Sequence, residues 1–269
     1  MAHSLYKCVS WLDDKSIDGI PTSGYWNDES VEKGKVFDIS GGDFSRLQTA
    51  IEMKGILPQV EYFCNFLPEG GLVGKGISLG AGVCWLETEI LKKNLAVAEL
   101  TCLEFSRHRI FTLAPQLLAH EGIAPNRVIL CLGSFYDLKI QDKSLDFVIL
   151  CQAFHHAAEP SKLIIEILRV LKPGGFVLIV GEHFYGWKIK INRFVKHIVK
   201  WGINFKSYRE RASFFPKYRD LFPPDPVKGD VHYSLKEYGN LFQGFGFKWI
   251  HTQDAKTSQQ GFLLSVDGS

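Results

Sequence analysis

The feature that most constrains this chain is an alternation of short apolar runs and amphipathic segments between residues 75 and 183. The run 145–153 is nearly all apolar, as expected of a strand covered on both faces. Repeated strand–helix units of this length predict a parallel sheet with right-handed crossovers. The predicted strands are 76–80, 97–105, 127–134, 145–153 and 176–180, and the predicted helices are 84–93, 106–120 and 160–171.

The rest of the chain is organised around this α/β core. Residues 1–70 are predicted to form a helical cap with a helix over 43–66, and residues 71–269 to form the main domain. A segment over 184–232 interrupts the pattern as an insert, after which the sequence predicts a helix over 234–242 and strands near 247–253 and 261–266. With 46% hydrophobic residues in 269, the chain can bury one sizeable core.

Composition excludes several classes of protein. A formal net charge of +2 gives no reason to expect a nucleic-acid partner. No apolar run approaches the roughly 18 residues of a membrane span, so integral membrane association is not expected. The first 15 residues carry Asp13 and Asp14 and no apolar stretch, so we expect a cytoplasmic protein without a signal peptide. None of the six cysteines forms a C-x-x-C pair, so no metal site is predicted.

Two features at predicted strand ends indicate a nucleoside ligand. Gly80, Ala81 and Gly82 form the first strand–helix turn, where glycines allow a sharp turn and close approach of a ligand to the backbone. Glu104 ends the second strand, about 20 residues further on, where an acidic residue accepts hydrogen bonds from ribose hydroxyls. Trp85 occupies the place of the third glycine of a dinucleotide fingerprint, which disfavours a pyrophosphate ligand and a nicotinamide oxidoreductase.

Four motifs follow one another in this part of the chain, at 76–82 (GISLGAG), 103–106 (LEFS), 144–156 (SLDFVILCQAFHH) and 166–175 (EILRVLKPGG). By the order and spacing of these motifs, residues 75–183 resemble the class I S-adenosylmethionine-dependent methyltransferases, particularly the branch with the quinone and sterol methyltransferases. Similarity is weaker over 232–266. The resemblance implies a Rossmann-like, doubly wound α/β fold with a seven-stranded, mostly parallel sheet whose last strand is antiparallel.

The resemblance also implies roles for residues that match the family's motifs. Gly80, Ala81 and Gly82 would line the methionine and ribose part of S-adenosylmethionine, and Glu104 would bind both ribose hydroxyls. The adenine would lie between Phe105 on one side and Ser134 and Phe135 on the other. The methionine end would face Gln152 and Ala153.

Three positions depart from the family's pattern. Ser78 and Ser134 stand where the family often has aspartate, and Cys84 where it often has a third small residue. Ser134 can still hydrogen-bond the adenine amine through its oxygen. These departures leave open a non-catalytic relative that keeps the fold.

Transfer of a methyl group to a hydroxyl also requires a base that takes the acceptor's proton. The candidates are His155 and His156 after the fourth strand, Glu182 and His183 after the fifth, and His232. His232, Tyr233 and Tyr185 are also candidate acceptor contacts, and so are Tyr25 and Trp26, which could form a lid or simply pack in the core.

The insert is aromatic and basic, with eight Lys or Arg residues against one Glu between 187 and 211. As a helix it would place Ile191, Phe194, Val195, Ile198 and Val199 on one stripe. Three interpretations stay open: a cap helix packed on the domain, a lid whose cations attract an anionic acceptor, or a membrane-surface helix that serves a lipid acceptor.

The sequence therefore predicts methyl transfer from S-adenosylmethionine to an oxygen or nitrogen of a small molecule such as a sugar or secondary metabolite. A lipid or quinone C-methyltransferase with peripheral membrane contact is the alternative reaction. Either a monomer or a homodimer is compatible with the sequence.

Overall fold

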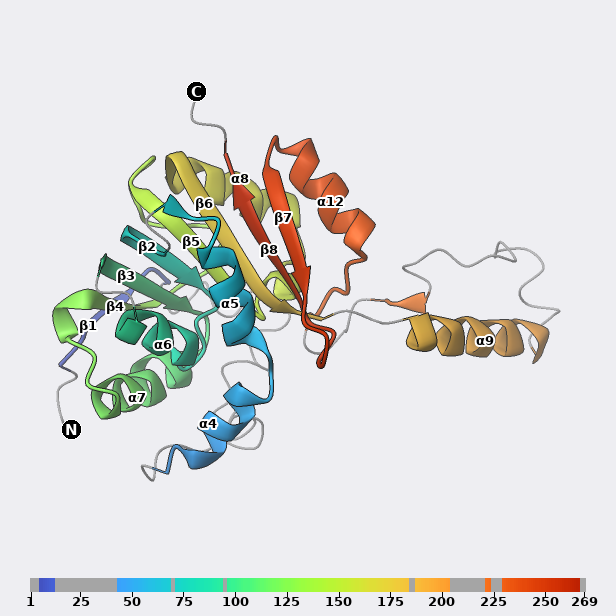
Figure 1. Cartoon of the computed structure of the whole chain (residues 1–269), viewed down its shortest axis with the longest axis horizontal. Helices are drawn as coiled ribbons and strands as arrows, with labels where there is room; N and C mark the ends of the chain where they lie inside the picture. The colour runs from blue at the N-terminus through green and yellow to red at the C-terminus, as the bar shows by residue number, and fades with distance from the viewer. Residues whose placement is uncertain are drawn as a thin grey trace.

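The structure of the protein is a computed structural model (Figure 1). It describes residues 5–12, 43–68, 71–93, 96–183, 187–203, 221–223 and 229–266.

One mixed sheet of eight strands organises the fold, in the order β1-β4-β3-β2-β5-β6-β8-β7. The pairs from β1 to β6 are parallel, and β8 runs antiparallel to both of its neighbours. The doubly wound, mostly parallel sheet with an antiparallel last strand is therefore confirmed. The strands are β1 (Lys7–Ser10), β2 (Gly74–Leu79), β3 (Val97–Glu104), β4 (Val128–Leu132), β5 (Leu145–Cys151), β6 (Leu171–Glu182), β7 (Lys248–Gln253) and β8 (Gln260–Ser265).

The count of seven strands was one too few, and the first 70 residues are not purely helical. β1 pairs in parallel with β4, from Lys7 opposite Ile129 to Ser10 opposite Leu132. The Trp11 amide extends the pairing by donating to the Leu132 carbonyl at 2.8 Å. Without β1, β4 would be an unpaired edge of the sheet. Residues 7–10 have no strand-like apolar pattern, and they form a strand because their backbone pairs with that edge.

Helices cover both faces of the sheet (Figure 1). The helix predicted over 43–66 is two helices, because Gly55 adopts a left-handed conformation (φ 65°) between them. The segment predicted as a helix over 106–120 begins with a π-helical turn, η2. The helical elements are α4 (Ser45–Glu52), α5 (Ile56–Cys64), α6 (Trp85–Lys93), η2 (Arg109–Leu113), α7 (Ala114–His120), η3 (Pro125–Arg127), η4 (Phe154–His156), α8 (Pro160–Val170), α9 (Trp187–Ile203) and α12 (Leu235–Gly244).

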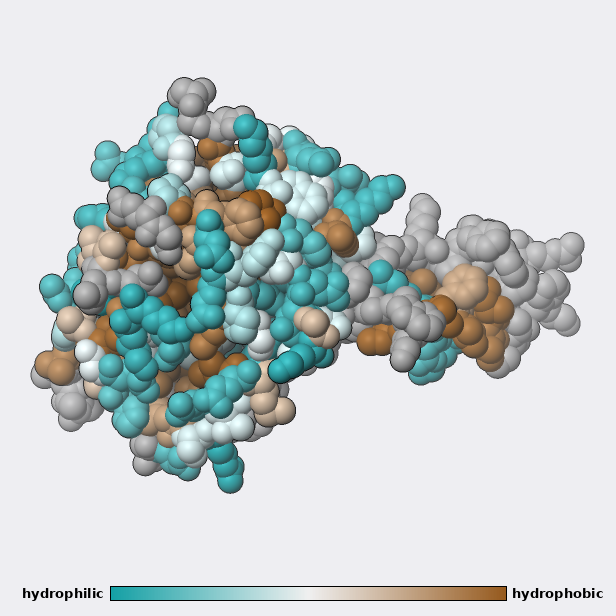
Figure 2. Space-filling model, in the orientation of Figure 1, coloured by the Kyte–Doolittle hydropathy of each residue, from teal (hydrophilic) through white to brown (hydrophobic). Residues whose placement is uncertain are grey.

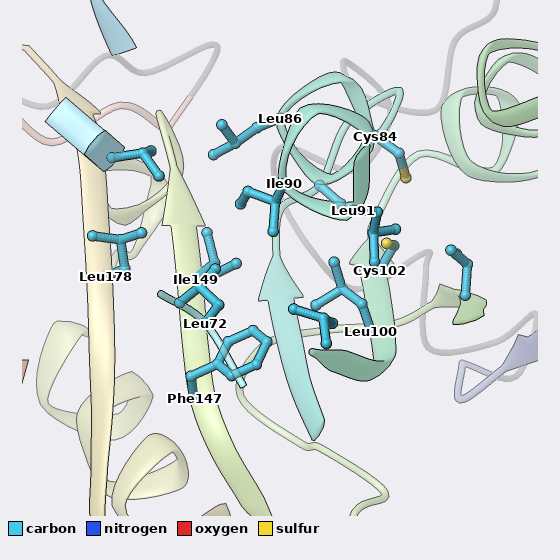
Figure 3. Close-up of a cluster of buried hydrophobic side chains, with 14 of the residues drawn as sticks. Leu72, Cys84, Leu86, Ile90, Leu91, Leu100, Cys102, Phe147, Ile149 and Leu178 are labelled. Carbon is cyan, nitrogen blue, oxygen red and sulfur yellow. The ribbon is translucent and has the colours of Figure 1, made fainter. Parts of the chain in front are cut away.

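The core has two large clusters, one on each face of the sheet, because side chains alternate across a strand, and a third, small cluster lies around Leu47 and Leu113. Phe147 and Ile149 of β5 face the helices α5, α6 and α7, whereas Val148 and Leu150 face α8 and α12. Figure 3 shows the first cluster between the sheet and α6. Its labelled residues are Leu72, Cys84, Leu86, Ile90, Leu91, Leu100, Cys102, Phe147, Ile149 and Leu178.

The second cluster is rich in aromatic rings. Phe154 packs edge-on against Phe242 of α12 with ring centroids 6.0 Å apart, and Tyr238 stacks near Phe262 at 4.7 Å. A capping box fixes the start of α12, since the Ser234 hydroxyl accepts from the Glu237 amide and the Glu237 carboxylate accepts from the Ser234 amide. This packing anchors the chain that leads into α12 beside the end of β5.

The insert helix α9 projects away from the sheet (Figure 1). Its apolar side chains Ile189, Ile191, Val195 and Val199 are each 43–53% exposed, and Figure 2 shows hydrophobic side chains on this projecting part. Arg193 donates to the Leu221 carbonyl at 2.8 Å and lies over the Phe222 ring. Among the residues that the structure describes, no helix has both the length and the apolar character to span a bilayer.

Candidate active site

A cavity of 410 Å³ opens at the carboxyl ends of β2, β3, β4 and β5, within the size range of small-molecule sites. Crossovers leave the sheet on opposite sides at the β2–β5 pair, where ligands bind in open α/β sheets. The wall includes all but one of the predicted cofactor residues, namely Gly80, Ala81, Gly82, Glu104, Phe105, Ser134, Phe135 and Gln152.

The glycine turn is built for close approach. Gly80 and Gly82 have φ values of 73° and 57°, a region that favours glycine. The amides of Gly80 and Ala81 both donate to the Leu103 carbonyl, at 2.8 and 2.9 Å, and so tie the turn to the end of β3. A β-carbon on Gly80 would lie 2.8 Å from that of Ala153. Ala153, expected at the methionine end, therefore packs behind the turn rather than on the cavity wall.

Glu104 is held rigidly at the end of β3. Its two carboxylate oxygens accept from the amides of Gly82 at 2.7 Å, Phe105 at 2.8 Å and Ser106 at 2.9 Å. An ionised carboxylate has about four lone-pair sites, so it can still accept from hydroxyl donors in the cavity. The carboxylate thereby links the glycine turn to the wall that Phe105 forms.

Ser134, Phe135 and Gln152 lie at the ends of β4 and β5. The Ser134 hydroxyl accepts from the Tyr136 amide at 3.3 Å, and the ring of Phe135 meets that of Tyr136 edge-on. Gln152 has a positive φ of 51°, a conformation that side chains rarely adopt. Such backbone strain clusters at functional sites, where the surrounding structure holds it in place.

Glu87 of α6 is a wall residue that the sequence analysis missed. It is fully buried, accepts a short hydrogen bond from the Ser78 hydroxyl, and burial raises its pKa to about 7. Its second oxygen has no hydrogen-bond partner among the described residues. An acidic residue three positions before Ile90 and four before Leu91, on the apolar face of α6, was the available signal.

Two cations, Lys54 and Arg109, also line the cavity and were not predicted. Lys54, between α4 and α5, donates to the Gln152 side-chain oxygen at 2.9 Å. Burial lowers the pKa of Lys54, and the nearby positive charge of Arg109 lowers it further. Both side chains reach the cavity because segments far apart in the chain pack together, and no local pattern in the sequence predicts such contacts.

The predicted histidines converge beside this cavity. The ring centroids of His155 and His156 lie 4.2 Å apart, those of His155 and His183 4.8 Å, and those of His183 and His232 6.4 Å. Of these, His156 is part of the cavity wall. The Val231 amide donates to the His155 carbonyl at 2.6 Å, which holds the chain before α12 against η4.

Glu182 lies beneath this cluster with no exposed surface. It accepts from the amides of Phe154 and His155 and from the Tyr238 hydroxyl at 2.9 Å, and its Oε2 lies 3.1 Å from His155 Nδ1. Burial acts to raise the pKa of Glu182, but the charge and hydrogen bond of His155 hold it below its usual value. Burial likewise opposes ionisation of His155, whose pKa Glu182 nevertheless raises. A carboxylate so enclosed positions η4 and does not reach the cavity.

Among the remaining predicted acceptor contacts, Tyr233 lies within the described residues and three others do not. Tyr233 is buried, and its hydroxyl donates to the Ala157 carbonyl at 2.9 Å, so it serves packing of the loop. His156 Nδ1 lies 2.9 Å from an oxygen of Asp230, a neighbour that the sequence analysis did not single out. Tyr25, Trp26 and Tyr185 lie outside the described residues.

Comparisons with known proteins show similarity to methyltransferases. Residues 77–179 match a family model described as a methyltransferase domain. An uncharacterized methyltransferase of Mycobacterium tuberculosis is 29% identical over 99 residues, 37% of this chain and 36% of that protein. The demethylmenaquinone methyltransferase of Listeria welshimeri is 25% identical over 146 residues, 51% of this chain and 57% of that enzyme.

Solved structures share the fold. A SAM-dependent methyltransferase from Aquifex aeolicus superposes with a TM-score of 0.50 and 17% identity, covering 77% of this chain and 91% of that one. Residues 77–179 therefore match a methyltransferase domain, and the chain has the fold of S-adenosylmethionine-dependent methyltransferases. The Listeria match is in keeping with the resemblance of the motifs to the quinone methyltransferases. The chain spans only about a third of the length of the mycobacterial relative that it matches.

Proposed function

We propose that this chain transfers a methyl group from S-adenosylmethionine to an oxygen or nitrogen atom of a small-molecule acceptor. The observation that carries the proposal is the Glu104 carboxylate, fixed by three amides between the glycine turn and Phe105 on the wall of one cavity. A carboxylate there matches the two hydroxyls of a ribose, and the turn leaves room for the groups attached to it.

The wall residues support a placement of the whole cofactor. Ser134 and Phe135 would contact the adenine opposite Phe105, and Gln152 would face the methionine end. The unpartnered oxygen of Glu87 supplies an acceptor for the methionine ammonium group, which would compensate for the serine at position 78. The positive charge of the ammonium would also stabilise the ionised form of a carboxyl group that burial otherwise disfavours.

The reaction is an in-line displacement in which the protein's contribution is positioning. The bond between sulfur and the methyl carbon breaks as the acceptor atom forms its bond to that carbon. The electron pair of the broken bond stays on sulfur, so the product is neutral S-adenosylhomocysteine, and the acceptor's proton leaves to a base or to water. His156 is the predicted base candidate that lies on the cavity wall.

The surroundings of the cavity indicate its acceptor. Lys54 and Arg109 favour an anionic small molecule, such as a phosphorylated or carboxylated sugar or secondary metabolite. Residues of α4 and the following turn, among them Leu47 and Ile51, close one side. We propose that the first 70 residues enclose the acceptor together with residues 229–232 of the insert, since α9 itself projects away from the sheet (Figure 1), in a cytoplasmic monomer or homodimer.

A second candidate is C-methylation of a lipid or quinone at a membrane surface. It is favoured by the exposed apolar side chains of α9, next to Lys190 and Lys196 on the same helix. The activity in the name of the Listeria relative points the same way. Methylation of a quinone by the purified chain only in the presence of vesicles would select this candidate.

Binding of S-adenosylhomocysteine, measured by isothermal titration calorimetry, tests the proposed cofactor site. We expect micromolar binding to the wild type and at least tenfold weaker binding to Glu104→Ala and Glu104→Gln, about 1.4 kcal/mol. Glu99→Ala is the matched control, because Glu99 lies on the same strand away from the cavity and pairs with Lys75. Absence of binding to the wild type would refute the proposal and favour a non-catalytic relative.

A further inference from the structure

Three side chains beside the cavity form an arrangement of the kind that holds a metal ion. His155 and His156 come from η4, after β5, and Asp230 comes from the chain before α12, 74 or more positions away. One ligand atom of each residue lies within 4.8 Å of the other two. Side-chain rotations that bring these atoms somewhat closer would let one ion reach all three at the 2.0–2.2 Å distances usual for zinc with nitrogen and oxygen ligands.

The groups behind His155 orient it as a ligand. Histidines that bind metals almost always use one ring nitrogen and hold the other on a carboxylate or carbonyl. His155 Nδ1 lies 3.1 Å from Glu182, which is itself fixed by two amides and the Tyr238 hydroxyl. This arrangement fixes the ring and leaves Nε2 as the nitrogen that can bind an ion.

The charges of these residues are also compatible with a bound divalent ion. Two neutral imidazoles and one carboxylate around a divalent ion leave a single positive charge, which the carboxylate of Glu182 balances behind His155. Burial of such a charge is acceptable only when it is paired in this way. His155 is buried, and the side chains of His156 and Asp230 are 28% and 15% exposed, although His156 Nδ1 and the Asp230 oxygen beside it are themselves buried.

We propose that His155, His156 and Asp230 bind one divalent transition-metal ion, of the zinc type, at the edge of the cavity, where the ion takes the acceptor's oxygen as a further ligand. Nitrogen ligands favour zinc and its neighbours over magnesium and calcium, which prefer sets made only of oxygen. His156 lines the same cavity as Gln152 and Ala158, so an ion bound there would lie beside the space that the acceptor would occupy.

Such an ion would decide the acceptor class. A bound divalent ion would make a coordinated hydroxyl much more acidic, so that its proton would leave to water and His156 would serve as a ligand instead of as the base. The oxygen then forms its bond to the methyl carbon as the bond between sulfur and carbon breaks. This part of the inference rests on the proposed methyl transfer and narrows it to a hydroxyl acceptor, whereas binding of the ion does not depend on it.

The first test is metal binding by the full chain after dialysis against a chelator. Zinc is titrated calorimetrically, and cobalt is followed by its visible absorption. We expect one ion per chain, with at least tenfold weaker binding to His156→Ala and to Asp230→Asn. Glu182→Gln should weaken binding 10–100-fold through the orientation of His155. His120→Ala is the matched control, since this exposed histidine lies on α7 and stacks on Phe44.

Binding of S-adenosylhomocysteine to the same variants separates the two proposals. If the wild type binds S-adenosylhomocysteine but binds zinc no more tightly than Asp230→Asn does, the metal site is refuted and the proposed methyl transfer is unaffected. A protein that binds one zinc through these residues but no nucleoside supports the metal site and refutes the cofactor proposal. The Asp230→Asn variant keeps the size of the side chain, and retained nucleoside binding shows that it is folded.

Discussion

Glu87 and Ser78 form a hydrogen-bonded pair beneath the glycine turn, in a place where the related motif often has an aspartate on the strand. Both residues are buried, Ser78 completely. Glu87 thus places an acidic group of α6 on the cavity wall beside Ser78. We infer that Glu87 could take the part of the aspartate that position 78 lacks, so the serine there need not mark a lost cofactor site.

Glu87 also makes the stability of the unliganded protein depend on pH. Its pKa is about 7 in the folded state, against 4.5 for the unperturbed group, so the folded state retains a proton that the unfolded state releases. The free energy of unfolding should therefore fall as pH rises from about 4.5 to 7 and level off above that. By linkage the loss is at most about 3 kcal/mol.

Urea unfolding of the wild type and Glu87→Gln, at pH 5 and pH 8, measures this effect. The glutamine variant should lose less stability than the wild type between the two pH values, because it has no proton to release there. Equal losses in the two proteins would show that Glu87 ionises freely in the folded state.

At the scale of a strand pair, Gly76 of β2 makes room for Phe147 of β5. The two residues are direct neighbours in the parallel register, and a β-carbon on Gly76 would lie 2.1 Å from the Phe147 ring. Phe147 has no exposed surface and stacks on Phe176 of β6, so it has little room to move. The glycine therefore allows an aromatic ring at the centre of the sheet.

We expect Gly76→Ala to lower the free energy of unfolding by about 1–3 kcal/mol, as overpacking of a filled core does. Gly244→Ala at the end of α12 is the control, because its β-carbon would meet no atom within 4 Å. That variant should be neutral or slightly stabilising. Chemical denaturation of both variants checks the difference, and a neutral Gly76→Ala would contradict the packing argument.

Elements differ in how far local sequence predicts them. The strands β3, β4 and β5 were found because a buried parallel strand is a continuous apolar run, and α8 because its apolar stripe has helical spacing. β6 begins at Leu171, earlier than expected, and runs through Pro173 and Gly174, because pairing with β5 already starts at Leu145 opposite Leu171. Contacts between strands extend this one beyond its local pattern.

At the scale of the whole molecule, α9 stands apart from the body, with a row of exposed apolar residues (Figures 1 and 2). Replacing Ile191 and Val195 together by glutamine should change the free energy of unfolding by less than about 0.5 kcal/mol per site, as exposed positions do. By contrast, Leu163→Ala in the buried face of α8 should cost about 2–5 kcal/mol. Thermal unfolding compares the two, and a large loss in the double variant would show that the row is covered.

Local sequence predicted the α/β class and the placement of Gly80, Gly82 and Glu104 around one site, because apolar runs mark buried strands and a parallel sheet brings the strand ends to one edge. The antiparallel last strand was expected only from the resemblance to the methyltransferase family. Three features depend on tertiary contacts. These are the eighth strand, the hydrogen bond from Lys54 to Gln152, and the proximity of Asp230 to His155 and His156. Those contacts join segments far apart in the chain, and their energy comes from packing and unpaired backbone edges that no local pattern encodes.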